Sequence, residues 1–251
     1  MGREERGWIF CLALLGFAAP AQSLTRGELL PFGPSAGDQI LAAGNDQTQR
    51  LELDRPVLFY DGTFHSIYIN TNGFVATAEP PGEASYLGRM PPRFGMIAAL
   101  QGDLDTSDGV GKVFFRQDSS PGVLSRAAEH INRAFPEDAA VSPTHAVVVT
   151  WADAAPQEPQ SRGDSLDRKF IPFHRETPSS ASSLPLETAS FAVLLYVDDG
   201  LQFTSTGAGD SAAVLHAGFS KGLVVGFLFS SQGPYYRITT DEEDSIRALA
   251  E

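Results

Sequence analysis

The chain has 251 residues, of which 42% are hydrophobic and 20% are charged. This composition is typical of a globular protein and excludes wholesale disorder, and no apolar run is long enough to span a membrane. The formal net charge of -13 argues against nucleic acids and anionic lipids as partners and favours basic surfaces or divalent cations.

The first 23 residues are expected to form a secretory signal peptide. The apolar stretch Ile9–Ala19 leads into an A-x-A sequence at 19–21, of the kind that signal peptidase cuts. The alternative is an N-terminal helix buried in the fold, which the small residues at the end of the stretch disfavour. The single cysteine, Cys11, lies inside the signal, so the mature domain, residues 24–251, is expected to have no disulfide.

Short strands are expected to dominate the mature chain. An Asn-Gly turn, Thr71-Asn72-Gly73, separates the alternating runs 67–70 and 74–77, which is a strong signal for a β-hairpin. Further strands are predicted at 96–100, 113–115, 146–151, 191–196, 202–205, 214–219, 224–229 and 235–239. Turn residues interrupt these strands at short intervals. The pattern predicts a mainly β fold, sandwich-like, with antiparallel hairpins.

Two short α-helices are expected to interrupt the strands. Ser120 can cap a helix that has Pro121 at its first position and runs to about Phe135. Its apolar stripe comprises Leu124, Ala127, Ala128, Ile131 and Phe135. A capping box at 240–243 predicts a second, terminal helix.

Residues 152–190 are rich in Pro and Ser and show no sustained apolar period, which predicts a long flexible loop. The tripeptide Arg162-Gly163-Asp164 lies in it. An exposed tripeptide of this kind can present a guanidinium and a carboxylate to an integrin, although most occurrences are chance. An integrin ligand is therefore an alternative function.

A secreted hydrolase is a second, less favoured alternative. Gly218–Gly222 matches G-x-S-x-G around Ser220, but a nucleophile elbow requires a helix after the serine, and a strand pattern follows here. The favoured interpretation is a hairpin turn. The Asp103 and Asp105 carboxylates are the other catalytic candidates, although one turn rarely supplies both faces of a sugar ring. The five histidines show no paired metal-ligand spacing.

The acidic turn at 103–109 is a weak calcium candidate. Asp103, Asp105 and Asp108 precede a glycine, as carboxylates do in some calcium loops. The spacing has one residue too many for the helix-flanked calcium loop, and the closing Glu is missing. Side chains that hydrogen-bond to the local backbone are the favoured interpretation. No other cofactor is expected.

An ordered series of stretches carries a family resemblance. They are LLPFGPSAGD (29–38), FYD (59–61), YINTNGFVATAEPP (68–81), GDLDTSDGVGKVFFRQD (102–118), SRAAEHINRAFP (125–136), THAVVVTW (144–151), YVDDGLQF (196–203) and VVGFLFSSQGPYY (224–236). The series resembles the amino-terminal globular domain of the nidogen (entactin) family, with a NIDO-type core at about 97–240.

This resemblance implies a secreted, non-enzymatic basement-membrane module that acts in cell–matrix adhesion. The family partners it implies are laminin, collagen IV and perlecan, contacted mostly through domains that lie beyond this segment. The chain departs from the family pattern after 151, where no strand is readable in RKFIPFHRETPSSASSLPLE. The departure predicts an unpaired sheet edge there.

Cleavage of the signal can be tested directly. The secreted protein is expected to begin between Gln22 and Leu24, because small residues must occupy the cleavage positions. N-terminal sequencing of secreted material checks this, and a start at Met1 or beyond Leu30 would contradict it.

Overall fold

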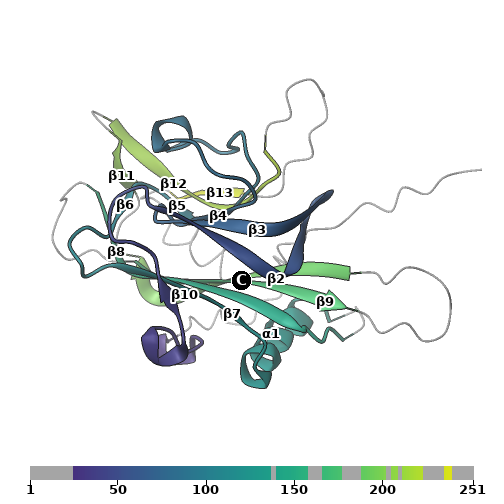
Figure 1. The fold of residues 1–251 in the computed structure, drawn as a ribbon. Coiled ribbons are helices and arrows are strands. Elements are labelled where there is room, and N and C mark those ends of the chain that lie inside the picture. The colour runs from purple at the N-terminus through teal and green to yellow at the C-terminus, as the bar shows by residue number, and fades with distance from the viewer. Residues whose placement is uncertain are drawn as a thin grey trace, which may run out of the picture.

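A computed structural model shows two β-sheets packed face to face, with one α-helix on the outer face of the first sheet (Figure 1). The structure describes residues 25–136, 140–157, 166–176, 188–201, 205–208, 211–222 and 235–238. No helix within these ranges is long and apolar enough to cross a membrane. The predicted mainly β, sandwich-like fold is confirmed.

The first sheet has six antiparallel strands in the order β1-β7-β8-β9-β10, and β6 pairs with the far end of β8. Its strands are β1 (Gln39–Ile40), β6 (Leu104–Asp105), β7 (Lys112–Asp118), β8 (His145–Pro156), β9 (Leu166–Glu176) and β10 (Thr188–Leu201).

The second sheet has seven antiparallel strands in the order β11-β12-β5-β4-β3-β2, and β13 also pairs with β12. Its strands are β2 (Thr48–Phe59), β3 (Gly62–Asn70), β4 (Phe74–Ala76), β5 (Met96–Gln101), β11 (Ser205–Ala208), β12 (Ser211–Ser220) and β13 (Tyr235–Ile238). Among the described residues, the short 3-10 helices η1 (Arg26–Glu28) and η2 (Pro34–Ala36) precede β1, and η3 (Glu83–Ser85) lies between β4 and β5.

The main core lies between the two sheets. Side chains along β8 alternate between this core and the cluster under the helix. Val147, Val149 and Trp151 contribute to the cluster between the sheets, whereas Ala146 and Val148 belong to the cluster under the helix. The indole Nε1 of Trp151, which is fully buried, donates a hydrogen bond of 3.0 Å to the carbonyl of Asn70 in β3. Both faces of β8 are therefore covered, which explains its continuous apolar sequence.

The helix predicted after Ser120 is confirmed. α1 (Pro121–Ala134) has Ser120 at its N-cap and Pro121 at its first position, although the Ser120 side chain makes no capping hydrogen bond. Val123, Ala127 and Ile131 form its buried stripe and pack with Leu195 of β10. The second predicted helix, at 240–249, lies outside the described residues.

The hairpin predicted around Asn72-Gly73 is also confirmed. β3 and β4 pair in register from Asn70 opposite Phe74 to Tyr68 opposite Ala76. Gly73 has φ +81°, and its carbonyl accepts hydrogen bonds of 3.0 and 2.9 Å from the amides of Ala99 and Leu100 in β5. The turn is thus pressed against the next strand of the sheet.

The prediction of a flexible loop at 152–190 is wrong in three places. β8 continues to Pro156, β9 occupies 166–176, and β10 begins at Thr188. β9 pairs with β8 on one side and with β10 on the other, so the predicted unpaired edge is filled. β9 is stabilised by hydrogen bonds to the strands on both sides of it. These pairings are not visible in the sequence, where Pro172 argues against a strand.

A buried ion cluster fastens the N-terminal segment to β7. The Arg116 guanidinium donates to Asp38 at 2.6 Å, to Asp118 at 2.8 Å and to the carbonyl of Pro31 at 3.1 Å. Its side chain is 8% exposed, and that of Asp38 only 1%. Burial alone would raise the pKa of Asp118, but hydrogen bonds from Ser120 and Arg116 outweigh it and hold that pKa below its usual value.

Substitution of Gly73 by alanine should destabilise the domain strongly. A Cβ atom at Gly73 would lie 1.8 Å from the carbonyl oxygen of Leu100, in addition to the strain of the positive φ. We expect a loss of about 3 kcal/mol in the free energy of unfolding. Gly109→Ala is the matched control, because φ is +73° there but no atom lies within 4 Å of its Cβ. Equal losses for the two variants, measured by urea unfolding, would contradict the close contact.

Arg116→Met should cost about 3–5 kcal/mol, because it leaves the buried carboxylate of Asp38 and the partly buried carboxylate of Asp118 without their partner. The folded pKa of Asp118 is depressed, so its contribution to stability is full above its unfolded pKa of about 3.9 and is lost as pH falls below it. The variant should therefore lose less of its stability than wild type does when the pH is lowered from 7 to 3. Arg133→Met is the control, because its pair with Glu129 is exposed and should contribute under about 0.5 kcal/mol. Melting curves at pH 7 and pH 3 measure both effects.

Candidate functional site

A polar network lies at one end of the sandwich, where the β3–β4 turn meets the connection from β5 to β6. Thr71 and Asn72 of the turn are fully buried. The Asn72 side chain donates to the Tyr86 hydroxyl at 2.9 Å and accepts from the amide of Leu104 at 2.8 Å. The carbonyl of Asn72 accepts from the amide of Gly102 at 3.2 Å. One turn residue therefore positions two separate segments, the loop that holds Tyr86 and the connection from β5 to β6.

Asp46 closes the network from the loop before β2. It has φ +49°, and its carboxylate accepts from the Tyr86 hydroxyl at 2.5 Å and from the amide of Glu83 at 3.2 Å. Asn72 also donates to Asp46 and to Glu83, both at 3.4 Å. Burial, together with the hydrogen bond to Asp46, raises the pKa of the Tyr86 phenol far above its usual value, so the phenol remains a neutral donor.

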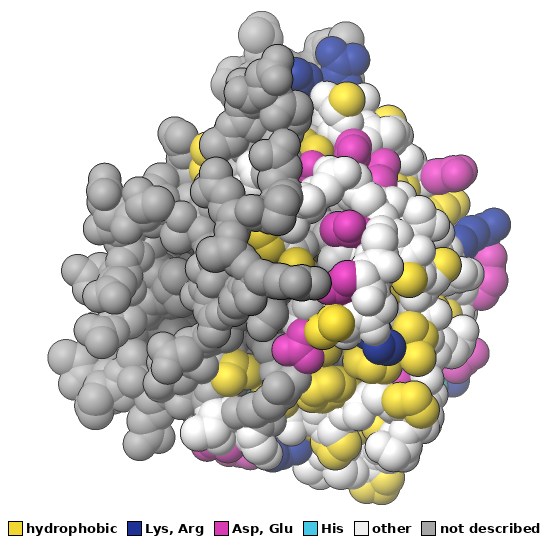
Figure 2. All heavy atoms as spheres, turned by 90° about the vertical axis from the view of Figure 1, so that its left-hand side faces the viewer, with side chains coloured by type: hydrophobic (Ala, Val, Ile, Leu, Met, Phe, Trp, Pro, Cys, Tyr) yellow, Lys and Arg dark blue, Asp and Glu magenta, His cyan; other side chains and the backbone are white. Residues whose placement is uncertain are grey.

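The charge of this network is negative. Among the described residues, no Lys or Arg side chain forms an ion pair with Asp46 or Glu83. Figure 2 faces this end of the molecule and shows Asp and Glu side chains spread between hydrophobic ones over the described surface. We call the loops at 44–47, 71–73, 83–86 and 102–111 the acidic loop end.

The acidic turn that the sequence singled out belongs to this end. Asp105 accepts from the amide and the hydroxyl of Ser107, at 2.8 and 2.5 Å. Asp108 accepts from the amides of Val110 and Gly111, at 2.9 and 3.3 Å. Both carboxylates thus bond to the local backbone, as the favoured interpretation held.

Asp103 is separated from the other two acids by its burial. It is 3% exposed, and its amide donates to the Thr206 hydroxyl at 2.9 Å. Within the described part of the chain, no group of three or more His, Cys, Asp or Glu side chains is placed to hold a metal ion. The structure therefore does not bring Asp103, Asp105 and Asp108 together as a ligand set, and calcium binding stays a prediction.

Ser220, the candidate nucleophile, is the last residue of β12 and is fully buried. Its hydroxyl accepts from the amide of Gly222 at 3.1 Å. His216 lies on the same strand, and four residues of extended chain separate the two by about 13 Å. The His216 ring contacts the amide oxygen of Gln101 at 3.1 Å. The described residues thus give Ser220 neither exposure nor His216 as a neighbouring base, in contrast to a nucleophile elbow.

The other predicted site cannot be placed. Arg162, Gly163 and Asp164 lie outside the described residues. The structure instead shows Asp46, Glu83 and Tyr86, which sequence reasoning missed. Only Gly44-Asn45-Asp46 carried a local signal, because Gly, Asn and Asp favour turns and left-handed backbone.

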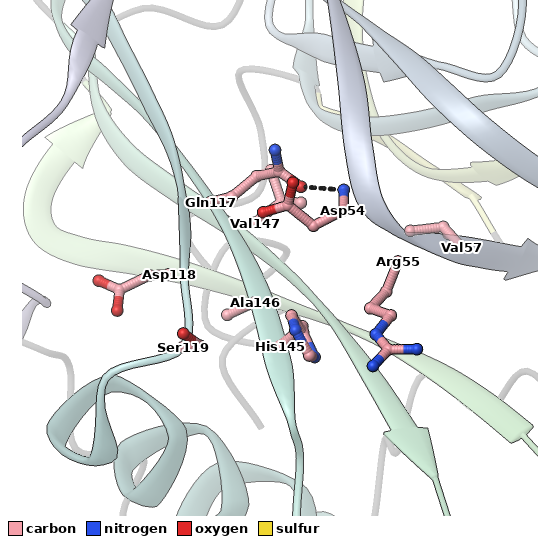
Figure 3. A pocket seen from close by; sticks show the side chains of 9 residues that line it. All are labelled: Asp54, Arg55, Val57, Gln117, Asp118, Ser119, His145, Ala146 and Val147. Carbon is pink, nitrogen blue, oxygen red and sulfur yellow. Dashed lines mark hydrogen bonds between the residues drawn. The ribbon is translucent and has the colours of Figure 1, made fainter.

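A small pocket opens at the other side of the sandwich, between β2 and the ends of β7 and β8 (Figure 3). Its volume is about 90 Å³, and Arg55 and His145 line it together with Asp54 and Asp118. Gln117 crosses it to accept a hydrogen bond of 2.7 Å from the amide of Asp54. The charges are mixed and the volume is that of a few water molecules, so the pocket is too small for a substrate of ordinary size.

Comparisons with known proteins agree with the resemblance. The sequence matches the Nidogen-like domain (NIDO) family over residues 65–251. It is 43% identical to mouse Nidogen-1 over 95% of this chain and 42% identical to human Nidogen-1 over 99% of it. Chicken Alpha-tectorin is a more distant relative, 24% identical over 88% of the chain. No solved structure matches the chain.

The chain spans about a fifth of the length of the Nidogen-1 proteins, 19% in mouse and 20% in human. These relatives confirm the predicted assignment to secreted proteins of the extracellular matrix. The match of the family over most of the chain, the two-sheet fold and the agreement in order of the motifs lead to one conclusion. The chain belongs to the Nidogen-like (NIDO) domain family.

Proposed function

We propose that this module is a non-enzymatic part of the basement membrane that acts in cell–matrix adhesion. The observation that carries the proposal is the identity of 42–43% to Nidogen-1 over nearly the whole chain. The buried hydroxyl of Ser220 argues in the same direction, because a nucleophile must be reachable by its substrate. Basement-membrane proteins are then the partner class, with laminin, collagen IV and perlecan as the candidates.

The acidic loop end is the surface that we assign to partner binding. Its loops are held by the buried network around Asn72, so they present their side chains with little loss of entropy on binding. Its exposed acids, such as Asp108, have the same sign of charge as the whole chain, whose formal net charge is -13. Such a surface attracts basic patches and gives an association that weakens with salt.

A binding experiment tests this assignment. The secreted chain is immobilised and exposed to purified laminin, collagen IV and perlecan, with and without calcium, at two salt concentrations. Asp108→Asn removes a charge from the acidic loop end and keeps an oxygen that can accept from Val110. We expect it to weaken binding of the true partner by about two- to fivefold at low salt.

Glu129→Gln is the matched control, because it removes one charge from the exposed face of α1. Equal binding by the control and by wild type, with weaker binding by Asp108→Asn, supports the acidic loop end. Equal losses in both variants would contradict it. No binding to any of the three proteins would contradict the partner class, and a requirement for calcium would support the predicted calcium site.

A further inference from the structure

β2 stands at the end of its sheet and exposes one edge. It is 12 residues long, pairs with β3 on one side, and has no described strand on the other. The first half of the strand is mostly exposed, including Thr48, Arg50 and Glu52. A long, exposed edge strand is a template for pairing with another chain unless it is protected.

A single side chain from the other sheet occupies the middle of this edge. The Gln117 amide of β7 accepts from the amide of Asp54 at 2.7 Å (Figure 3). It also donates to the carbonyl of Glu52 at 3.0 Å. The side-chain amide of Gln117 therefore bonds to one N–H and one C=O of the β2 backbone, as a peptide group of a neighbouring strand would.

Three further features close parts of the same edge. Gln49 donates to the carbonyl of Arg50 at 2.9 Å, and Leu58 donates to the Ser190 hydroxyl at 2.9 Å. Pro56 has no amide hydrogen to offer. The register with β3 also shifts between Glu52 and Val57, which bends the strand. Bulges, prolines and charged residues are the usual protections of edge strands.

We propose that the outer edge of β2 is a pairing surface for a second copy of this chain, which Gln117 keeps closed. The bonds to Gln117 show that the backbone groups of Glu52 and Asp54 point outward, so by alternation those of Thr48 and Arg50 do as well. Antiparallel pairing about a two-fold axis at Leu51 then joins these residues in hydrogen-bonded pairs.

The charges fit this register. Arg50 would lie opposite Glu52 of the second copy, and the two-fold axis repeats the pair. Within one copy the two side chains already form an ion pair of 2.7 Å, but they are 56% and 68% exposed, so this pair can be exchanged for the one between copies. The groups held by Gln117 are among those that the ladder requires: the carbonyl of Glu52 would accept from Arg50 of the second copy, and the amide of Asp54 would donate to its Thr48. Removal of Gln117 therefore frees these two groups. The carbonyl of Arg50 is also required, and the exposed Gln49 side chain that donates to it must turn away when the second copy pairs.

The experiment compares the association state of the secreted full chain with that of Gln117→Ala, by sedimentation velocity over a range of concentrations. Wild type is expected to remain monomeric, whereas Gln117→Ala forms a dimer with an association constant at least about tenfold higher. Gln117→Ala with Arg50→Pro should return to monomer, because proline removes the outward amide of Arg50 and leaves the bonds to β3 intact. Gln39→Ala, which removes an exposed glutamine from β1, is the control.

Each other outcome overturns the inference. A monomeric Gln117→Ala variant would show that the edge does not pair, and a dimer that survives Arg50→Pro would place the contact elsewhere. Gln117→Glu covers the case in which the alanine variant does not fold, because it can still accept from Asp54 but can no longer donate to Glu52. It should give an intermediate dimer fraction, and a fraction equal to that of wild type would overturn the inference.

Discussion

The side-chain amide of Asn72 is the interaction on which one end of the molecule depends. It is fully buried, and its partners are Tyr86 from the loop after β4 and Leu104 at the start of β6. A buried amide that loses its partners costs about 1–3 kcal/mol for each unsatisfied group, so the loops can move apart only at high cost. The position of the acids around Asp46 and Glu83 therefore follows from a hairpin turn that bears no charge itself.

β7 has the corresponding role at the other end of the sandwich. The side chains of successive residues in a strand point to opposite faces of the sheet, and the neighbours Arg116 and Gln117 make contacts on the two faces of β7. Arg116 reaches Asp38 and the carbonyl of Pro31, and so fastens the N-terminal segment. Gln117 reaches to β2 at the exposed edge and joins the two sheets there. An apolar pair at these positions would fill space but would leave the edge and the segment unattached.

Local signals carried most of the fold. The Asn-Gly turn fixed the β3–β4 hairpin, and Ser120-Pro121 with the stripe at Ala127 and Ile131 located α1. β9 was missed because Pro172 and the polar residues around it argue against a strand, and only its two neighbouring strands make one favourable. The polar network was missed for a related reason. Tyr86 and Asp46 are 40 residues apart, and nothing in either local sequence indicates that they meet.

The polar groups of the acidic loop end and of β12 are mostly engaged with neighbouring groups of the fold. Tyr86 is held neutral, Ser220 is buried, and Asp105 and Asp108 accept hydrogen bonds from their own backbone. The same acids still contribute their charge to the field outside the molecule, because a hydrogen bond does not neutralise a carboxylate. Because no described Lys or Arg side chain pairs with Asp46 or Glu83, the negative charge of this end is left to act on basic surfaces outside the molecule, which is what the binding proposed above requires.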